Sequence, residues 1–143
     1  MGFRYVDDAI TADVAFEAEG ETLQGVLESA WEATVTLMIE DPAVLGKEER
    51  REVSVVSDDA EMLLFDLLGE LLYLKDAEGV LLNLSGSTLE RKDDGLHFAA
   101  EAEGEQIDPE RHTLGVDIKA VTLHQFRLEE RNGRWHARVV LDT

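Results

Sequence analysis

The sequence contains no cysteine and only two prolines among its 143 residues. Without cysteine, disulfides, thiol catalysis and thiolate metal sites are excluded, and the simplest compartment is the cytoplasm. No apolar run approaches the ~20 residues that a membrane-spanning helix needs. The first residues reach an acidic side chain by Asp7, which is not the pattern of a signal peptide. These absences predict a cytoplasmic protein that does not enter a membrane.

Basic residues are also scarce, with 13 Lys and Arg against 32 Asp and Glu, a net charge of −19 and a pI near 4.3. So acidic a chain repels phosphate backbones, and we expect no direct binding of nucleic acid through a broad basic face. The charge favours cations and basic partner surfaces, although most carboxylates are expected to form a solvated acidic coat. Hydrophobic residues make up 44% of the chain, which is enough for one core.

Hydrophobic spacing predicts two helices. The first opens at Thr22 as N-cap, carries an apolar stripe to Met38 and stops before Pro42. The second begins among acidic residues at 57–61, where carboxylates favour the positive end of the helix dipole, and ends before Gly79. Its apolar surface is broad, as in a helix covered on more than one side. We expect its leucines to be buried: Leu63, Leu64, Leu67, Leu68, Leu71 and Leu72.

Alternating residues and turn signals predict the strands. Asn132-Gly133, between two alternating runs, is the strongest hairpin signal. A second hairpin is expected at the turn 92–95, which Asp94-Gly95 supports. The expected strands are 14–19, 51–57, 80–84, 88–91, 96–102, 116–128 and 135–141, with charged or polar loops at 47–52 and 104–113. The sequence thus predicts an α+β fold, a single compact domain over 1–143 with two main helices and a mixed or antiparallel sheet.

Catalytic constellations are not apparent in the sequence. It offers no defensible Ser/His/Asp or Cys/His arrangement and no Gly-rich phosphate loop. Its four histidines lack the close helical spacing of a zinc site, so surface or hydrogen-bonded roles are expected for them. They are His97, His112, His124 and His136. The residues therefore favour a binding protein over an enzyme.

Carboxylates are the remaining candidate ligands. Asp7, Asp8 and Asp13 cluster near the N-terminus, and Asp142 lies beside the terminal carboxylate of Thr143. Oxygen donors alone suit hard cations such as Ca²⁺ or Mg²⁺. If the strands that follow Asp13 and precede Asp142 are neighbours in the sheet, these anionic groups converge. Because the chain has 32 acidic residues, proximity in sequence is weak support by itself.

Lys119 lies in a predicted strand that is otherwise short of charge. Alternation places Lys119, Val121 and Leu123 on one face and Thr122 and His124 on the other. Two interpretations stay open: a solvent-facing lysine on a half-exposed strand, or a positive charge that balances the acidic cluster or holds a phosphate.

Five segments, in order and over nearly the whole chain, resemble the archease family. They are Thr11-Ala12-Asp13 followed by a short strand, Gly20 and Thr22-Leu23; the Leu-rich stretch 59–73; Gly104-Glu105-Gln106-Ile107-Asp108; Lys119-Ala120-Val121-Thr122-Leu123-His124; and a closing strand with Asp142 next to last. The family usually opens with Asp-His-Thr-Ala-Asp. Here Ile10 stands in place of the His, Ala9 in place of the first Asp, and Asp8 is the nearest acid.

The resemblance implies a fold of strand–helix–strand–strand units, one inserted in another, and an accessory protein without catalysis of its own. It implies activation of a GTP-dependent tRNA-splicing RNA ligase, by promoting guanylylation and multiple turnover. The alternative is a chaperone-like partner of a tRNA cytosine methyltransferase, and a metal-dependent hydrolase is weakest because no base or nucleophile is identifiable. The implied cofactor is Ca²⁺ or another divalent cation such as Mg²⁺, held by Asp13, Asp142 and Thr143. Lys119, Asp8 and His124 are further expected contacts.

Overall fold

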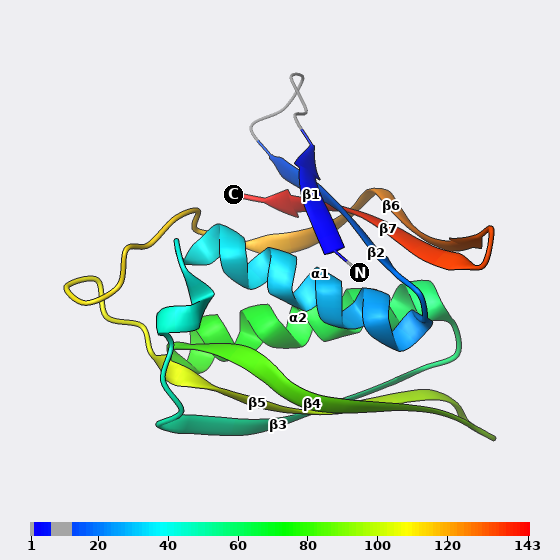
Figure 1. The fold of residues 1–143 in the computed structure, drawn as a ribbon, viewed down its shortest axis with the longest axis horizontal. Helices are drawn as coiled ribbons and strands as arrows, with labels where there is room; N and C mark the ends of the chain where they lie inside the picture. The colour runs from blue at the N-terminus through cyan, green and yellow to red at the C-terminus, as the bar shows by residue number, and fades with distance from the viewer. Residues whose placement is uncertain (1, 7–12) are drawn as a thin grey trace.

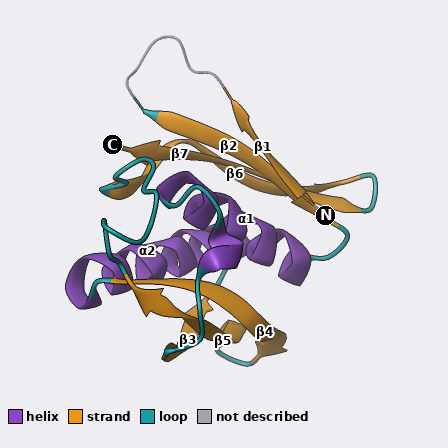
Figure 2. Cartoon of the chain, turned by 60° about the vertical axis from the view of Figure 1, so that its left-hand side comes forward, coloured by secondary structure: helices purple, strands orange, loops and turns teal. Residues whose placement is uncertain are grey.

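Two helices lie between two antiparallel sheets in the computed structural model, which describes residues 2–6 and 13–143 (Figures 1 and 2). The first sheet has the order β1 (Gly2–Val6), β2 (Val14–Gly20), β7 (Arg134–Asp142), β6 (Ala120–Arg131). The second has the order β3 (Glu49–Ser57), β5 (Gly95–Gln106), β4 (Val80–Lys92). The predicted α+β class and the two helices are confirmed, and every strand pair is antiparallel.

The chain order inserts one unit into another, as the family resemblance implied. Strand β2 leads into α1 (Leu23–Met38), and β6 and β7 complete the same sheet at the other end of the chain. Between them come a 3-10 turn (Pro42–Val44), β3, α2 (Ala60–Glu78), β4 and β5. The three strands of this inserted unit form the second sheet. Residues from the two ends of the chain therefore lie side by side in one sheet.

Local capping chemistry sets the helix ends. The Thr22 hydroxyl accepts a hydrogen bond from the Gly25 N–H at 3.0 Å, as expected for an N-cap. The Asp59 carboxylate does the same for the Met62 N–H at 2.8 Å at the start of α2. Gly79 closes α2 in the left-handed region at φ 69°, where a Cβ is costly. Both predicted helices are confirmed.

The core lies between the sheets. All six leucines predicted on α2 are buried, from 0% to 5% exposed. The two sheets and α1 surround α2, which explains why so much of its surface is apolar. Trp31 on α1 is also buried, and its indole N–H donates to the Leu82 carbonyl at 2.9 Å. Neither helix among the described residues is long and apolar enough to cross a membrane.

The strands differ from the sequence prediction at several boundaries. β4 is continuous across the expected break, because a bulge between Leu84 and Gly86 preserves its pairing with β5. β3 begins inside the expected charged loop, β5 extends to Gln106, and β1 was not predicted. The turn predicted over 92–95 is present between β4 and β5, where Lys92 pairs with Gly95 and residues 93–94 form the turn. The Asn132-Gly133 turn is confirmed, with φ 53° and 77°.

β6 departs most from its predicted form. It begins at Ala120 rather than at 116, and its pairing with β7 is irregular between Thr122 and Arg127. Gln125 lies within this irregularity at φ 53°. The simple alternation predicted for 116–128 is therefore wrong, and Lys119 lies directly before the strand instead of inside it.

Candidate metal and partner-binding site

The register of β2 and β7 places Asp13 and Asp142 opposite each other. Val14 pairs with Leu141, so Asp13 and Asp142 are the next positions outward on the two antiparallel strands. Residues opposite each other in such a pair point to the same face, with Cβ atoms about 4.5–5.5 Å apart. Asp142 is exposed and Asp13 is half-buried. The adjacency of strand ends on which the sequence prediction depended is therefore present.

The third strand at this end brings Lys119 close. Ala120 of β6 pairs with Asp142, and the Lys119 N–H donates to the Asp142 carbonyl at 2.8 Å. Lys119 is exposed and lies opposite Thr143 in the register. Figure 1 shows this end of the sheet, where β7 reaches the C-terminus beside the start of β2. Four of the sequence-predicted residues thus gather at one sheet end.

Of the other two predicted contacts, the structure describes only His124. His124 is exposed in the irregular segment of β6, and no hydrogen bond between described residues joins it to Asp13 or Asp142. Asp8 lies outside the described residues.

The donor set at the sheet end consists of oxygen atoms. Asp13 and Asp142 present two carboxylates opposite each other, and Thr143 follows Asp142 at the same end. Across the described residues, no three His, Cys, Asp or Glu side chains cluster as metal ligands. The arrangement suits a hard cation with a partly open coordination shell and does not suit zinc.

A buried polar cluster around Glu105 was not assigned from the sequence. Glu105 is 5% and His112 4% exposed. The Glu105 carboxylate accepts from the Gly46 N–H at 3.0 Å, pairs with the Arg111 guanidinium at 2.8 Å, and lies 3.4 Å from His112 Nε2. His112 Nδ1 accepts from the Asp108 N–H at 3.0 Å. The cluster joins the loop after α1 to the connection between β5 and β6.

The connection between β5 and β6 leads to Lys119 at the sheet end. Lys75 holds the last residues of this connection, Asp117 and Ile118, in place. The Lys75 ammonium group donates to the Ile118 carbonyl at 2.6 Å and to the Asp117 carboxylate at 3.2 Å. Its side chain is only 10% exposed. Contacts at both ends of the 107–119 connection therefore position Lys119 relative to Asp142.

We expect Glu105→Gln to destabilise the protein at neutral pH and to cost progressively less in acid. The Gly46 N–H first, then His112 and Arg111, hold the pKa of Glu105 below its ordinary value of 4.5, against the opposing effect of burial. A lowered pKa adds stability above the unfolded-state pKa, and this stability is lost as the pH falls through the folded-state pKa. Urea midpoints of both proteins from neutral pH to below 4.5 measure the difference.

Glu101→Gln is the matched control, because Glu101 is exposed on the same strand. An equal loss in both variants, or a difference that stays constant into acid, would contradict the role of Glu105.

A sequence model of the archease protein family matches residues 3–143. The chain belongs to the archease family. It is 40% identical over 141 residues to the protein archease of Methanothermobacter thermautotrophicus, which covers 99% of this chain and 98% of that protein. It is 41% identical over 133 residues to the protein archease of Methanosarcina mazei, covering 92% and 90%. The resemblance stated from the sequence motifs is confirmed.

Solved structures of relatives share the fold. The solution structure of protein 1598 of Methanobacterium thermoautotrophicum is 37% identical, has a TM-score of 0.86 and covers 99% of both chains. The crystal structure of an archease of Thermotoga maritima, described as a possible chaperone, is 22% identical with a TM-score of 0.67, covering 98% of this chain and 99% of that one. The second comparison supports the fold alone.

Proposed function

We propose that this member of the archease family is a cytoplasmic accessory protein that activates a GTP-dependent tRNA-splicing RNA ligase. In this role it promotes guanylylation of the ligase and multiple turnover, and it performs no catalysis itself. One observation carries the proposal beyond family membership: Asp13, Asp142, Thr143 and Lys119 come together at an exposed sheet end. A charged tip of this kind is suited to enter the site of a larger partner.

The proposed cofactor is Ca²⁺ or another divalent cation such as Mg²⁺. Three anionic groups at one strand end repel one another, and a bound cation relieves that repulsion. Asp13, Asp142 and Thr143 would hold the ion by oxygen atoms, in fewer positions than the six to eight that Ca²⁺ takes. Water or groups of the ligase would fill the others. Lys119 cannot coordinate, because an ammonium group has no lone pair, and it balances charge instead. His124 and Asp8 remain proposed functional contacts and are not among these ligands.

Guanylylation of the cognate ligase tests the proposal. The assay measures covalent GMP on the ligase with and without this protein, across a series of divalent ions. We expect faster guanylylation and more than one turnover per ligase when the protein is present. If no divalent ion supports stimulation, the leading function is wrong.

A second candidate is a chaperone-like partner of a tRNA cytosine methyltransferase. The archease of Thermotoga maritima is described as a possible chaperone, and this description is the reason for the second candidate. Light scattering of the methyltransferase during heating separates the two functions: a chaperone lowers aggregation without affecting guanylylation, whereas a ligase activator has the opposite pattern.

We expect the isolated protein to bind RNA weakly at physiological salt and its ligase complex to weaken as salt rises. The net charge of −19 repels phosphate but attracts a basic, RNA-binding ligase, and salt screens that attraction. Calorimetric titrations of ligase and of RNA at several salt concentrations measure both effects. Tight RNA binding by the protein alone at physiological salt is the result that this expectation forbids.

A further inference from the structure

The outward face of the first sheet carries an unusual concentration of arginine. Arg4, Glu17, Arg138 and Arg127 form one row across all four strands, because each pairs with the next in the register. Arg131 and Arg134 pair nearer the β6–β7 turn. Alternate residues of a strand point to the same side, so these side chains share one face. We call it the arginine face, formed by Arg4, Arg127, Arg131, Arg134 and Arg138.

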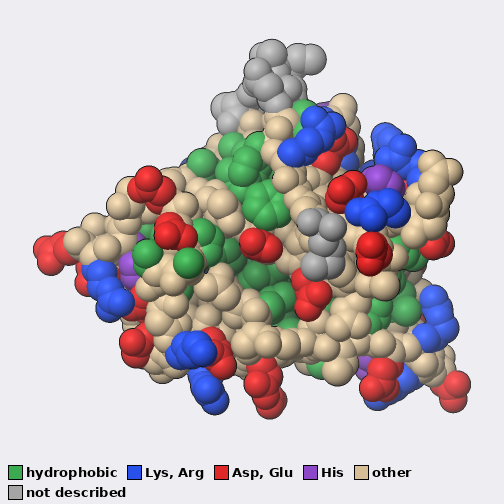
Figure 3. Space-filling model, viewed as in Figure 1, with side chains coloured by type: hydrophobic (Ala, Val, Ile, Leu, Met, Phe, Trp, Pro, Cys, Tyr) green, Lys and Arg blue, Asp and Glu red, His purple; other side chains and the backbone are tan. Residues whose placement is uncertain are grey.

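The composition of this face is opposite to that of the whole chain. It holds five of the 13 basic side chains of a protein whose net charge is −19. All five are arginines, whereas the four lysines lie elsewhere. Three glutamates share the face, Glu17, Glu19 and Glu129, so the arginines outnumber them. In Figure 3 blue side chains gather at the upper right, towards the β6–β7 end of the first sheet.

Ion pairs account for the glutamates but not for all of the arginines. Glu17 lies between Arg4, with which it forms an ion pair, and Arg138 at 3.8 Å. The Arg127 side chain forms no ion pair or hydrogen bond with any other residue that the structure describes. Away from Asp13 and Asp142, which lie at the far end of the same face, positive charge therefore remains after the glutamates are matched.

The remaining two arginines of the face, Arg131 and Arg134, form ion pairs in which one guanidinium nitrogen lies near each carboxylate. Arg134 lies 3.5 Å from Glu19 and 3.9 Å from Glu21, and Arg131 lies 3.0 Å from Glu129. Their side chains are 37% and 60% exposed. A guanidinium group has five N–H donors, so each of these arginines keeps donors for a ligand.

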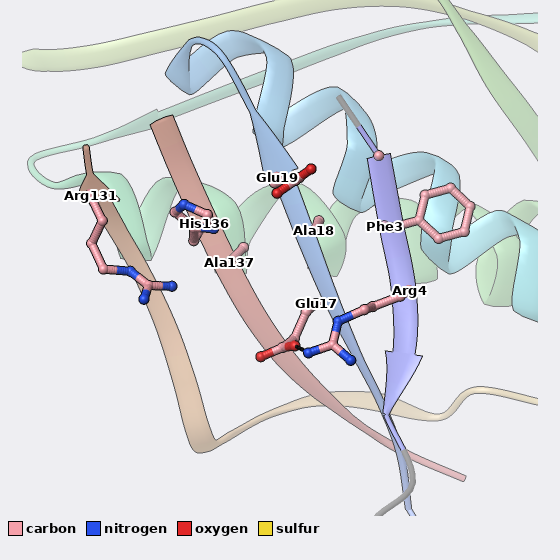
Figure 4. Close-up of a pocket in the computed structure, with 9 residues that line it drawn as sticks. Phe3, Arg4, Glu17, Ala18, Glu19, Arg131, His136 and Ala137 are labelled. Carbon is pink, nitrogen blue, oxygen red and sulfur yellow. Dashed lines mark hydrogen bonds and ion pairs between the residues drawn. The ribbon is translucent and has the colours of Figure 1, made fainter. Parts of the chain in front are cut away.

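The face is hollowed where these side chains rise from the sheet. A pocket of about 580 Å³ is lined on β1 by Arg4, on β2 by Glu17 and Glu19, and on the hairpin by Arg131 and His136. Figure 4 labels these side chains together with Phe3, Ala18 and Ala137, which occupy the alternate positions of β1, β2 and β7 and belong to the opposite side of the sheet. The hollow gives a charged group access to several guanidinium groups at once.

We propose that the arginine face binds the phosphate backbone of single-stranded RNA. Arginine forks match phosphate oxygens bidentately, which a lysine ammonium does not. Asp142 lies on the same face of β7 as Arg138 and Arg134, four and eight residues away, or about 14 and 27 Å along the strand. A strand of RNA that leaves the tip at Asp13 and Asp142 would therefore pass over these arginines.

The choice of RNA over another anionic polymer rests on the proposed function. Both candidate partners act on RNA, so RNA is the polyanion present in either complex. The proposal agrees with weak RNA binding by the isolated protein, because the arginine face is local and the net charge of −19 opposes it. At low salt, or beside a basic ligase, the attraction between these arginines and the phosphates is expected to place RNA on the arginine face.

A chemical-shift titration of the full chain with a short single-stranded oligouridylate at low salt tests the site. The test variant is Arg127→Gln with Arg131→Gln and Arg134→Gln. The control removes equal charge from the second sheet by Arg50→Gln, Arg91→Gln and Lys92→Gln. We expect RNA to shift the amides of β6, β7 and β1 in the wild type and the control, and not in the test variant.

The salt dependence supplies a second readout. Losing three phosphate contacts should reduce the slope of log K against log salt by about 2. Arg127→Gln alone should reduce it by about 0.7, and this change removes no side-chain hydrogen bond or ion pair among described residues. Shifts centred elsewhere, or equal slopes in test and control variants, would overturn the proposal.

Two further arms separate the alternatives. An oligoglutamate peptide that shifts the arginine face when RNA does not would assign the face to an acidic protein and overturn the RNA proposal. The RNA titration contains no ligase, so it stands apart from the guanylylation assay. Absence of ligase stimulation with an intact RNA response rejects the proposed function alone, whereas stimulation without an RNA response rejects only the RNA site.

Discussion

Leu67→Ala is expected to lower the free energy of unfolding by about 2–5 kcal/mol. Leu67 is fully buried on α2, where the helix is enclosed by α1 and both sheets, so the loss of its side chain leaves a cavity that little can fill. A domain of this size has a total stability of about 5–15 kcal/mol, and the change removes a large share of it. Leu71→Ala should behave in the same way. Urea unfolding followed by circular dichroism measures both variants.

Gly69→Ala is the matched control on the same helix. Gly69 is exposed, and a Cβ built on it has no heavy atom within 4 Å. Alanine in a helix interior is preferred over glycine by about 0.5–1 kcal/mol, so this variant should gain stability. Unchanged stability of both leucine variants would show that α2 is not the centre of the core.

The helices were predictable because their signals are local. The Thr22 cap, the stop before Pro42 and the glycine at 79 each act within one turn of the helix they bound. The broad apolar surface of α2 also predicted burial on more than one side. Which elements bury it could not be predicted, since that depends on two sheets assembled from distant segments.

Strand boundaries were less predictable, because they depend on pairing partners. Residues 85–87 are Ser, Gly and Ser and indicate a break, yet the bulge keeps β4 paired through them. Residues 115 and 116 are not part of β6, because their N–H groups bond to the Met38 and Leu37 carbonyls at the end of α1. The backbone of these two residues is thus hydrogen-bonded to a helix end instead of to a strand. The alternating pattern of the sequence does not indicate such a partner.

The polar sites also combine parts that local sequence predicts with parts that depend on distant segments. The Asn-Gly turn predicts the hairpin that carries Arg131 and Arg134, but Arg4 joins their face through β1, which was not expected. Alternation along β5 directs Glu105 away from the core, because its neighbours Ala102 and Gly104 are both buried. It is buried only because Gly46 and Arg111 fold over it from two other segments. A cluster built by loops leaves little trace in local sequence.

Asp13→Ala and Asp142→Ala are each expected to reduce calcium affinity by at least about tenfold and to abolish stimulation of the ligase. Losing even an outer partner of a metal ligand typically costs 10–100-fold in affinity, and these residues are proposed as ligands themselves. The two carboxylates lie opposite each other in the register of β2 and β7, so neither can be replaced by a neighbour without moving a strand. Calorimetric titration with Ca²⁺ and the guanylylation assay measure the two effects.

Two further variants separate coordination from charge. A chain extended past Thr143 converts its carboxylate to a peptide group and should bind the ion more weakly. Lys119→Ala should keep calcium binding, because the ammonium group donates no lone pair, and removal of a nearby positive charge should strengthen it. Lys119→Ala can still lose ligase stimulation, which would assign the lysine to the partner. The proposed site is wrong if the wild type, both aspartate variants and the extended chain bind the ion alike. It is equally wrong if none of them binds it and each still stimulates the ligase.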